Sequence, residues 1–329
     1  AVTPNGSLAA SCGRDATVRL WTFSGAEVAI IKLKTEVICV ALAADGSRLV
    51  VGQGKQVWVL DAQKKKLIKA MSKHTGVVRA VALSPSGDFA LSGSMDMTVM
   101  LWDMTKLEYV RSFLGHQGVI RGVCMSGSRA VSVAQDMQVR VWSLESGEAE
   151  QIMKGHEEDV RGCSISADGT LVATCSFDKT VRVWNVESGA LHCCMDGHSD
   201  KVFGVSMSND GKTVVSCSWD MSVRVWDVQS GAPAGKPMQP PSLLSRLTSS
   251  FRRGGGEGSV SLAERIRALT QSAETGDKRK RAAQQGFAAL PDEAASSTAV
   301  MPEFGTFTSG KVLAQALSPV VPPASQHQV

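Results

Sequence analysis

Short runs of alternating apolar and polar residues, separated by turn residues, make up most of the first 230 positions of the chain. In one such stretch, the runs cover Val77–Leu83, Phe89–Ser92 and Val99–Asp103, and the turn Ser84-Pro85-Ser86-Gly87 follows the first run. Alternation with a period of two indicates β-strands, and a Pro-x-Gly sequence between two runs indicates a tight turn. The pattern therefore predicts short antiparallel strands.

Aspartate and tryptophan recur six positions apart in five places along this pattern. The pairs are Asp15 and Trp21, Asp96 and Trp102, Asp136 and Trp142, Asp178 and Trp184, and Asp220 and Trp226. From Trp102 onward, the tryptophans lie 40, 42 and 42 positions apart (142−102, 184−142 and 226−184). Four short strands repeated every ~40–45 residues are typical of a β-propeller. Because one small sheet cannot bury both of its faces alone, we expect the repeats to pack around a ring.

Three of the repeats open with Gly-His, at Gly115-His116, Gly155-His156 and Gly197-His198, and an earlier one opens at His74. Together with the closing tryptophan, which aspartate often follows, these residues resemble the WD-repeat family over about residues 1–230. The resemblance implies an all-β fold, the WD-repeat β-propeller. We expect about five complete blades and a partial one, which form either a short ring or a fragment of the seven-bladed ring usual in the family.

Two repeats depart from the pattern. The first begins at residue 2 without an opening strand or histidine. The second, about Thr35 to Asp61, keeps a turn at Asp45-Gly46 and a strand at Val57–Leu60 but lacks the histidine, the aspartate and the tryptophan. Leu60 stands where the tryptophan is expected, so packing alone should hold this blade, and we expect it to be the weakest.

The composition changes after residue 238. We therefore predict two domains, a propeller at 1–238 and a low-complexity, largely disordered tail at 239–329 that is rich in Ser, Ala, Gly, Pro and Gln. The spacing of Leu262, Ile266 and Leu269 predicts a short helix over 261–272. The basic cluster from Lys278 to Arg281 has the composition of a nuclear-import signal or an acidic-partner contact, although a solvated charge run is the commoner case.

The charges of the repeats cancel. Residues 1–230 contain 24 Lys and Arg and 24 Asp and Glu, whereas residues 231–329 contain 11 and 7, so the net charge of +4 lies in the tail. A neutral propeller lacks the basic surface with which proteins bind nucleic acid regardless of sequence. No apolar run is long enough to span a bilayer. We therefore expect the propeller to bind neither nucleic acid nor a membrane.

All eight cysteines precede residue 218, and Cys12, Cys175 and Cys217 occupy one equivalent position in different repeats. Equivalent positions lie far apart in a ring, so these three cannot pair with one another. Reduced thiols and a cytoplasmic location are therefore expected, or a nuclear one if the basic cluster acts as a signal. The adjacent Cys193 and Cys194 have histidines nearby, but no second Cys/His pair has the spacing of metal ligands, so neither a metal nor a cofactor is predicted.

Four repeats each carry a histidine, a hydroxyl residue, an aspartate and a tryptophan. The sets are His74, Ser92, Asp96 and Trp102; His116, Ser132, Asp136 and Trp142; His156, Thr174, Asp178 and Trp184; and His198, Ser216, Asp220 and Trp226. A hydrolase needs one nucleophile, base and acid, whereas this chain has four such sets. The resemblance implies a structural role, in which aspartate, histidine, hydroxyl and indole form one chain of hydrogen bonds. We predict no catalytic residues and no enzyme activity.

The resemblance also implies that partners bind on the rim where the aspartate turns and histidine loops emerge. Two positions in each repeat should point there, either directly before the aspartate or five residues after the histidine. They are Arg14, Met95, Gln135, Phe177 and Trp219, and Arg79, Arg121, Arg161 and Phe203. Arginines beside exposed aromatic residues suit an acidic or phosphorylated peptide with one apolar anchor. The alternative is that the arginines pair with nearby acids such as Glu157, Glu158 and Asp159.

These observations predict a non-catalytic scaffold that holds other proteins or peptides. Two alternatives remain. One is a substrate-recruiting adaptor of a larger complex such as a ubiquitin ligase, although the basic residue often seen after the Trp-Asp pair in that class is replaced by Thr105 and Gln229. The other is a nuclear or RNA-associated factor in which the basic tail makes the contact. The sequence names no pathway, because this fold carries many functions.

Overall fold

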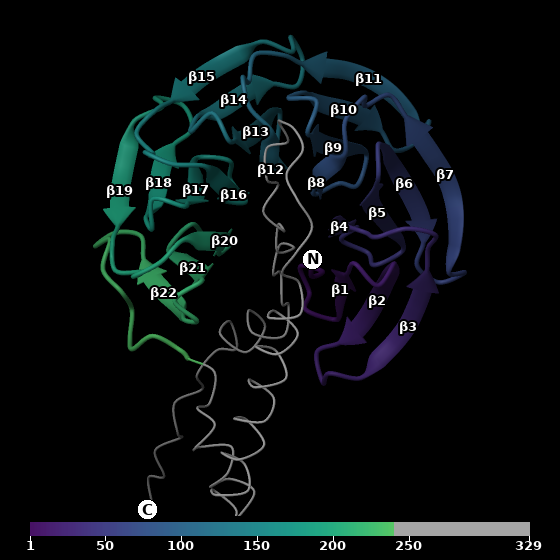
Figure 1. The fold of residues 1–329 in the computed structure, drawn as a ribbon, viewed down its shortest axis with the longest axis horizontal. Helices are drawn as coiled ribbons and strands as arrows, with labels where there is room; N and C mark the ends of the chain where they lie inside the picture. The colour runs from purple at the N-terminus through teal and green to yellow at the C-terminus, as the bar shows by residue number, and fades with distance from the viewer. Residues whose placement is uncertain (240–329) are drawn as a thin grey trace, which may run out of the picture. The chain divides into compact units, whose positions relative to one another are not determined.

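The computed structural model describes residues 1–239, in which β-strands form six separate antiparallel sheets (Figure 1). Sheet 1 contains β1 (Leu8–Cys12), β2 (Thr17–Thr22) and β3 (Glu27–Lys32); sheet 2 contains β4 (Cys39–Leu42), β5 (Arg48–Gln53), β6 (Gln56–Asp61) and β7 (Lys66–Ser72); and sheet 3 contains β8 (Val78–Leu83), β9 (Phe89–Ser94), β10 (Val99–Asp103) and β11 (Glu108–Phe113). Sheet 4 contains β12 (Ile120–Ser126), β13 (Arg129–Ala134), β14 (Val139–Ser143) and β15 (Ala149–Met153); sheet 5 contains β16 (Val160–Ile165), β17 (Leu171–Ser176), β18 (Val181–Asn185) and β19 (Leu191–Met195); and sheet 6 contains β20 (Val202–Met207), β21 (Thr213–Ser218) and β22 (Val223–Asp227).

The sheets are the blades of a propeller. In each of them the strands pair in the order of the chain. The innermost strands β4, β8, β12, β16 and β20 lie next to one another, whereas β3, β7, β11, β15 and β19 form the perimeter in Figure 1. The all-β WD-repeat-type propeller expected from the repeats is therefore confirmed.

The number of complete blades differs from the expectation. Four sheets have four strands, and sheets 1 and 6 have three, so four blades rather than five are complete within residues 1–239. After Trp226 the chain returns along β22, but it makes only isolated bridges at Pro233 and Met238. Two prolines and a glycine between residues 233 and 237 explain this, because proline donates no hydrogen bond and glycine weakens a strand.

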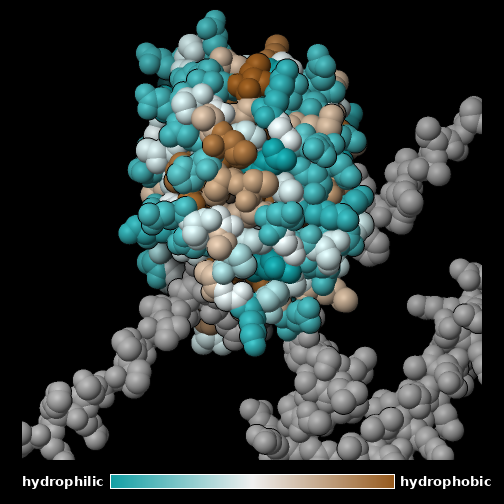
Figure 2. Space-filling model, turned by 90° about the vertical axis from the view of Figure 1, so that its left-hand side faces the viewer, coloured by the Kyte–Doolittle hydropathy of each residue, from teal (hydrophilic) through white to brown (hydrophobic). Residues whose placement is uncertain are grey.

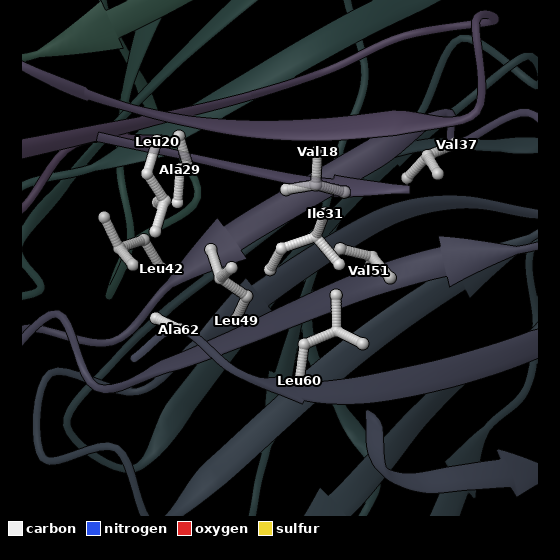
Figure 3. Close-up of a cluster of buried hydrophobic side chains, with 11 residues drawn as sticks. Val18, Leu20, Ala29, Ile31, Val37, Leu42, Leu49, Val51, Leu60 and Ala62 are labelled. Carbon is white, nitrogen blue, oxygen red and sulfur yellow. The ribbon is translucent and has the colours of Figure 1, made fainter. Parts of the chain in front are cut away.

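The second repeat forms a complete four-stranded sheet although it lacks the histidine, aspartate and tryptophan. Leu60 stands opposite Leu49, as Trp102 stands opposite Ala90, and it is 0% exposed. Figure 3 shows Leu49, Val51 and Leu60 of this sheet facing Val18 and Ile31 of sheet 1. Packing of apolar side chains between sheets thus replaces the polar set in this blade.

The outer surface is mainly polar. Figure 2 views the side of the molecule on which β19 lies in Figure 1, and it shows a narrow band of hydrophobic residues on a hydrophilic surface. Ile152 in β15 and Leu191 in β19 are among the exposed apolar residues of the perimeter. Single exposed apolar side chains of this kind are normal for a folded protein and suggest no binding site by themselves.

The predicted low-complexity tail at 239–329 lies outside the described residues, apart from residue 239. The same holds for the short helix predicted over 261–272 and for the basic cluster from Lys278 to Arg281. These features therefore stay predictions from the sequence.

Candidate partner-binding site

Sheet 3 contains a closed chain of hydrogen bonds between side chains. The Nδ1–H group of His74 donates to Oδ2 of Asp96 at 2.8 Å, and the Ser92 hydroxyl donates to Nε2 of His74 at 2.7 Å. The indole N–H group of Trp102 donates to the same hydroxyl oxygen at 2.8 Å. These directions follow from the ionised aspartate, which can only accept hydrogen bonds. The chain gives the buried imidazole, hydroxyl and indole their partners.

Sheets 4, 5 and 6 repeat this chain with the same atoms. The sets are His116, Ser132, Asp136 and Trp142; His156, Thr174, Asp178 and Trp184; and His198, Ser216, Asp220 and Trp226, with all distances at 2.7–2.8 Å. Across the four sheets the histidine side chains are at most 1% exposed and the aspartates at most 8%. The arrangement therefore leaves no reactive group open to a substrate, and it supports the register of the strands.

The ionisation of these sets follows from burial and hydrogen bonding. Burial alone would raise the pKa of Asp96, but hydrogen bonds from Thr98 and the neighbouring His74 outweigh it and lower this pKa to about 2. The same balance of burial against hydrogen bonds lowers the pKa of Asp220 to about 2. Burial lowers the pKa of His74, and Asp96 offsets this only in part. Near neutral pH the carboxylates are therefore ionised and His74 is uncharged.

A further hydroxyl, two residues after the aspartate, completes most of these sets and was missed by the sequence reasoning. Thr98 donates to Oδ1 of Asp96 from its backbone N–H at 3.0 Å and from its hydroxyl at 2.6 Å. Thr180 and Ser222 make the same two bonds in sheets 5 and 6, whereas Gln138 in sheet 4 offers only its backbone N–H. The spacing Asp-x-Ser/Thr is an Asx-turn signal that could have revealed them.

The expected rim positions directly before the aspartates are bonded to the loops that follow the histidines. The residue before each aspartate donates its backbone N–H to the carbonyl three residues after the histidine, at 2.8–3.0 Å. These bonds join Met95 to Val77, Gln135 to Val119, Phe177 to Asp159 and Trp219 to Lys201. The turn that holds the aspartate is thus tied to the loop that follows the histidine.

The residues five positions after the histidine lie at β-bulges of the innermost strands. The pairing register shifts on either side of Arg79, Arg121, Arg161 and Phe203, which leaves each of them as the extra residue. A bulge changes the direction in which a side chain points. Sequence spacing located these positions but could not show where their side chains would lie.

Arg121 and Arg161 share one carboxylate across neighbouring sheets. A guanidinium nitrogen of Arg121 lies 3.1 Å from Oδ2 of Asp159, and one of Arg161 lies 3.4 Å from the same oxygen. All three side chains are only 9–12% exposed. This arrangement corresponds to the alternative in which the arginines pair with nearby acids, and it limits what their charge can offer to a partner.

Three aromatic rings gather on the rim of sheets 5 and 6. Phe203 lies between the other two, with ring centroids 4.7 Å from Trp219 and 5.0 Å from Phe177. Arg161 lies 4.7 Å from the Phe177 ring centroid, and Lys201 lies 4.6 Å from it and 5.8 Å from that of Trp219. We call these five residues the aromatic ledge. Its two cations were not anticipated together from the sequence, because they belong to different repeats.

The remaining expected residues lie on the rim of other sheets. Met95 and Gln135 are exposed, Arg79 is half-buried, and the exposed Arg14 lies 3.7 Å from a carboxylate oxygen of Glu36. The structure brings none of these four into the aromatic ledge.

Comparison with known proteins shows which family these repeats represent. The family model "WD domain, G-beta repeat" matches residues 1–22, 65–103, 107–143, 147–185 and 189–227, which together make up more than half of the chain. The chain belongs to the WD-repeat family. The matches leave out residues 23–64, which contain most of the second repeat, whose polar set is absent.

Relatives of this WD-repeat chain carry different names. It is 37% identical over 76 residues to the F-box/WD repeat-containing protein 10 of Mus musculus, a match that covers 23% of this chain and 7% of the relative. It is 27% identical over 121 residues to a guanine nucleotide-binding protein subunit beta-like protein of Encephalitozoon cuniculi, covering 35% of this chain and 36% of the relative. It is 26% identical over 125 residues to the pre-mRNA-processing factor 19 of Bos taurus, covering 36% of this chain and 25% of the relative.

The chain thus spans little more than a third, at most, of the length of these relatives. WD-repeat propellers generally mediate protein–protein interactions, and the family is typically non-catalytic. The relatives have different names, which are consistent with adaptor or scaffold roles but do not distinguish between these roles.

Within residues 1–239, no group of three or more histidine, cysteine or acidic side chains is placed to hold a metal ion. The same part of the WD-repeat chain contains no helix that is long and apolar enough to cross a membrane. Burial raises the pKa of the Cys39 and Cys175 thiols well above the usual range, so these thiols are protonated and unreactive.

Proposed function

We propose that this WD-repeat propeller is a non-catalytic scaffold that binds partner proteins or peptides at the aromatic ledge on the rim of sheets 5 and 6. The stack of Phe177, Phe203 and Trp219 is the observation that carries the proposal. Trp219 is 49% exposed, so a large part of its indole ring is open to a partner. Large exposed aromatic residues and arginines are the types enriched where protein partners bind most tightly.

The ledge is already ordered before a partner arrives. The backbone N–H of Trp219 donates to the carbonyl of Lys201 at 3.0 Å, and that of Phe177 donates to the carbonyl of Asp159 at 3.0 Å. These bonds fix the two turns on the rigid edge of the sheets. Because little side-chain freedom is then lost on binding, a rigid aromatic surface of this kind can bind a short peptide.

We propose that the partner segment is acidic or phosphorylated and carries one apolar residue. Lys201 places a positive charge beside the rings of the ledge, whereas the charge of Arg161 is already paired with Asp159. Met221, which lies two residues beyond Trp219 in the same turn, is 74% exposed. Carboxylate or phosphate oxygens would pair with Lys201 while an apolar side chain lies on Trp219.

A substrate-recruiting adaptor is the second candidate function. The names of two relatives that contain "F-box/WD repeat", from Mus musculus and Homo sapiens, favour it. Thr105 and Gln229 stand where a basic residue was expected in that class, and this weighs against it. Both functions would use the same ledge, and they differ in whether the bound protein is held or handed on for modification.

We further propose that the protein acts in the cytoplasm, because all eight cysteines are free thiols within the described residues. A nuclear or RNA-associated role would depend on the basic cluster from Lys278 to Arg281, which lies outside the described residues. Imaging of the full chain beside a variant with these four residues changed to Ser would separate the two locations.

A peptide array tests the proposed site. Immobilised peptides would vary in three respects: net charge, a phosphoserine, and one aromatic or leucine residue. The full chain should bind acidic or phosphorylated peptides that contain the apolar residue, and it should bind their basic counterparts at background level. Trp219→Ala should abolish this signal, while Met137→Ala, at a residue that is 43% exposed on the rim of sheet 4, should keep it. Equal binding by both variants would reject the ledge as the site.

A further inference from the structure

Two cysteines meet where sheet 4 packs on sheet 5. Cys124 belongs to β12 and Cys163 to β16, the innermost strands of these sheets, which lie next to each other (Figure 1). We call such a contact between two neighbouring innermost strands a seam. The thiol group of Cys163 is hydrogen-bonded to that of Cys124. The two residues are 39 positions apart in the chain (163−124), so only the packing of one sheet on the next brings them together.

The backbones of β12 and β16 are in close contact at this place. A Cβ atom added to Gly122 would lie 3.2 Å from the Cα atom of Gly162 and 3.3 Å from the backbone nitrogen of Cys163. Both cysteine side chains pack against one buried cluster, which includes Val131 of sheet 4 and Val172 of sheet 5. In a disulfide the two Cα atoms lie about 4.4–6.8 Å apart, so strands in such close contact can be joined by one.

The seam between sheets 5 and 6 shows where a side chain at the position of Cys124 points. Ser164 is its equivalent in sheet 5, because both residues pair with the residue directly before the hydroxyl residue of the polar set. The Ser164 hydroxyl oxygen accepts a hydrogen bond from the backbone N–H group of Met207 in β20 at 3.0 Å. A side chain at this position therefore reaches across the seam to the next innermost strand.

The other three seams contain no sulfur at these two positions. The equivalent pairs are Ala41 and Val81 between sheets 2 and 3, Ala82 and Val123 between sheets 3 and 4, and Ser164 and Val205 between sheets 5 and 6. Alanine or serine beside valine is thus sufficient to pack a seam of this propeller. The two thiols add a reactivity that packing does not require.

The two thiols are reduced in the structure and are open to small molecules. Both are free, and Cys124 and Cys163 are each half-buried rather than fully buried. The hydrogen bond to Cys124 and burial raise the pKa of the Cys163 thiol well above its usual range. Because a protonated thiol reacts slowly, the pair stays reduced until a strong oxidant is present.

We propose that Cys124 and Cys163 are a modification site at which hydrogen peroxide forms a reversible disulfide that ties sheet 4 to sheet 5. One sulfur attacks the peroxide, takes up an oxygen atom as S–OH and releases water. The other sulfur, already in contact, displaces this hydroxyl group, which leaves as a second water with the remaining thiol hydrogen. Two hydrogens and two electrons thus pass from the thiols to one peroxide. Two molecules of a thiol reductant reverse the step and become a disulfide themselves.

The bond would stabilise the folded chain. It closes a loop that contains the 38 residues between the two cysteines (163−124−1), and a disulfide limits the freedom of the unfolded chain more as the loop becomes longer. The rim above the same seam carries the ion pair of Arg121 with Asp159. The oxidised seam would therefore be held by both a charge pair and a covalent bond. None of this depends on binding at the aromatic ledge.

Peptide mapping of the oxidised full chain tests the proposal. The reduced chain is treated with one equivalent of hydrogen peroxide, and the remaining thiols are then blocked. Cleavage after Lys and Arg and before Asp gives peptides 122–129 and 162–167, each with one cysteine. These two peptides should form the main disulfide-linked pair. Links mainly to other cysteines, links between two molecules, or oxidation of these cysteines without a link would each overturn the proposal.

Two substitutions introduce residues that the next seam already contains, so both variants should fold. Cys124→Ser copies Ser164, and Cys163→Val copies Val205. Each substitution should abolish the linked peptide pair. Cys194→Ser, at an exposed cysteine of β19, is the matched control and should keep it. Loss of the linked pair in this control as well would overturn the proposal.

The melting temperature shows whether the bond ties the two sheets. The oxidised chain should melt at least about 4 °C above the reduced chain, and dithiothreitol should remove the difference. Cys124→Ser and Cys163→Val, treated with peroxide in the same way, should gain nothing, which separates the bond from oxidation elsewhere in the chain. An oxidised chain that contains the bond but melts at or below the temperature of the reduced chain would overturn the proposed tie.

Discussion

The indole ring of Trp219 lies stacked on the phenyl ring of Phe203, with centroids 4.7 Å apart and ring planes 26° apart. The two residues belong to different parts of one repeat, the aspartate turn and the bulge of β20. Their contact turns two separate rim positions into one apolar surface beside Lys201. Binding at the aromatic ledge should therefore depend on both rings together.

Replacement of this indole separates binding from stability. For Trp219→Ala we expect a loss of at least about tenfold in affinity for the peptide selected from the array. The free energy of unfolding should change by about 1 kcal/mol or less, since half of the side chain is already exposed. Fluorescence polarisation and urea denaturation measure the two quantities. Met137→Ala serves as the control, and a loss of affinity in the control as large as that in Trp219→Ala would contradict the prediction.

Removal of one aspartate tests whether the buried sets are structural. Asp178→Ala leaves the Nδ1–H group of His156 without its acceptor at 2.7 Å and two hydrogen bonds from Thr180 unmade. We expect the free energy of unfolding to fall by about 2–4 kcal/mol, because each buried unsatisfied group costs about 1–3 kcal/mol. Asp168→Ala, in an exposed turn of the same sheet, should cost less than about 1 kcal/mol. An unchanged melting temperature for Asp178→Ala would sink the structural interpretation.

Acid should destabilise the propeller in two stages. Burial holds the pKa of His74 and of His198 below the ordinary 6.5. When the pH falls below 6.5, these histidines take up protons in the unfolded chain before they do so in the folded protein, so the free energy of unfolding decreases. The carboxylates act in the same direction at lower pH. The pKa of Asp96 and of Asp220 falls from 3.8 to about 2 on folding, so their contribution is present above pH 3.8 and is lost toward pH 2.

In the lower pH range, protonation of each of these two aspartates should reduce the free energy of unfolding by about 2 kcal/mol. The urea concentration at the midpoint of unfolding, measured from pH 8 to pH 2, should be constant above neutral pH. It should decrease below pH 6.5 and again between pH 3.8 and about pH 2. Asp96→Asn should make the fall below pH 4 shallower, since one of the protons linked to unfolding is removed. A midpoint that rises on acidification would contradict this account.

The repeats were predictable because their signals recur at fixed offsets. The distance from Asp96 to Trp102 is repeated in four other places, and it placed the strands and the buried sets without any structure. The end of the sixth repeat was not predictable in the same way. The prolines at 233 and 237 leave only isolated bridges there, where the complete sheets have a fourth strand.

The rim was harder to predict because its contacts join different repeats. Arg121 and Asp159 are 38 positions apart (159−121), and nothing local in the sequence links them. Spacing gave the position of Arg121 on the rim, whereas the bulge and the neighbouring sheet decide which charge it meets. Interactions of this kind follow from the packing of one blade on the next, which the sequence of a single repeat does not contain.

The carboxylate shared by two arginines gives a test of the rim that does not depend on any partner. Asp159→Ala leaves Arg121 and Arg161 facing each other without the anion between them, in a place where all three side chains are at most 12% exposed. We expect the free energy of unfolding to fall by about 3 kcal/mol, because breaking a buried ion pair leaves a desolvated charge behind. Glu157→Ala and Glu158→Ala, at exposed neighbours, should each change it by less than about 0.5 kcal/mol.

The same geometry explains why charge reversal at Arg121 and Arg161 would be a poor test of binding. Two acidic residues beside Asp159 would repel it at short range, so the variant should lose stability whether or not a partner uses this surface. Its melting temperature should fall by several degrees, as expected for a loss of a few kcal/mol in a domain of this size. If the reversed variant melts like the parent chain, Asp159 does not hold the two arginines, and their charge is available to an acidic partner after all.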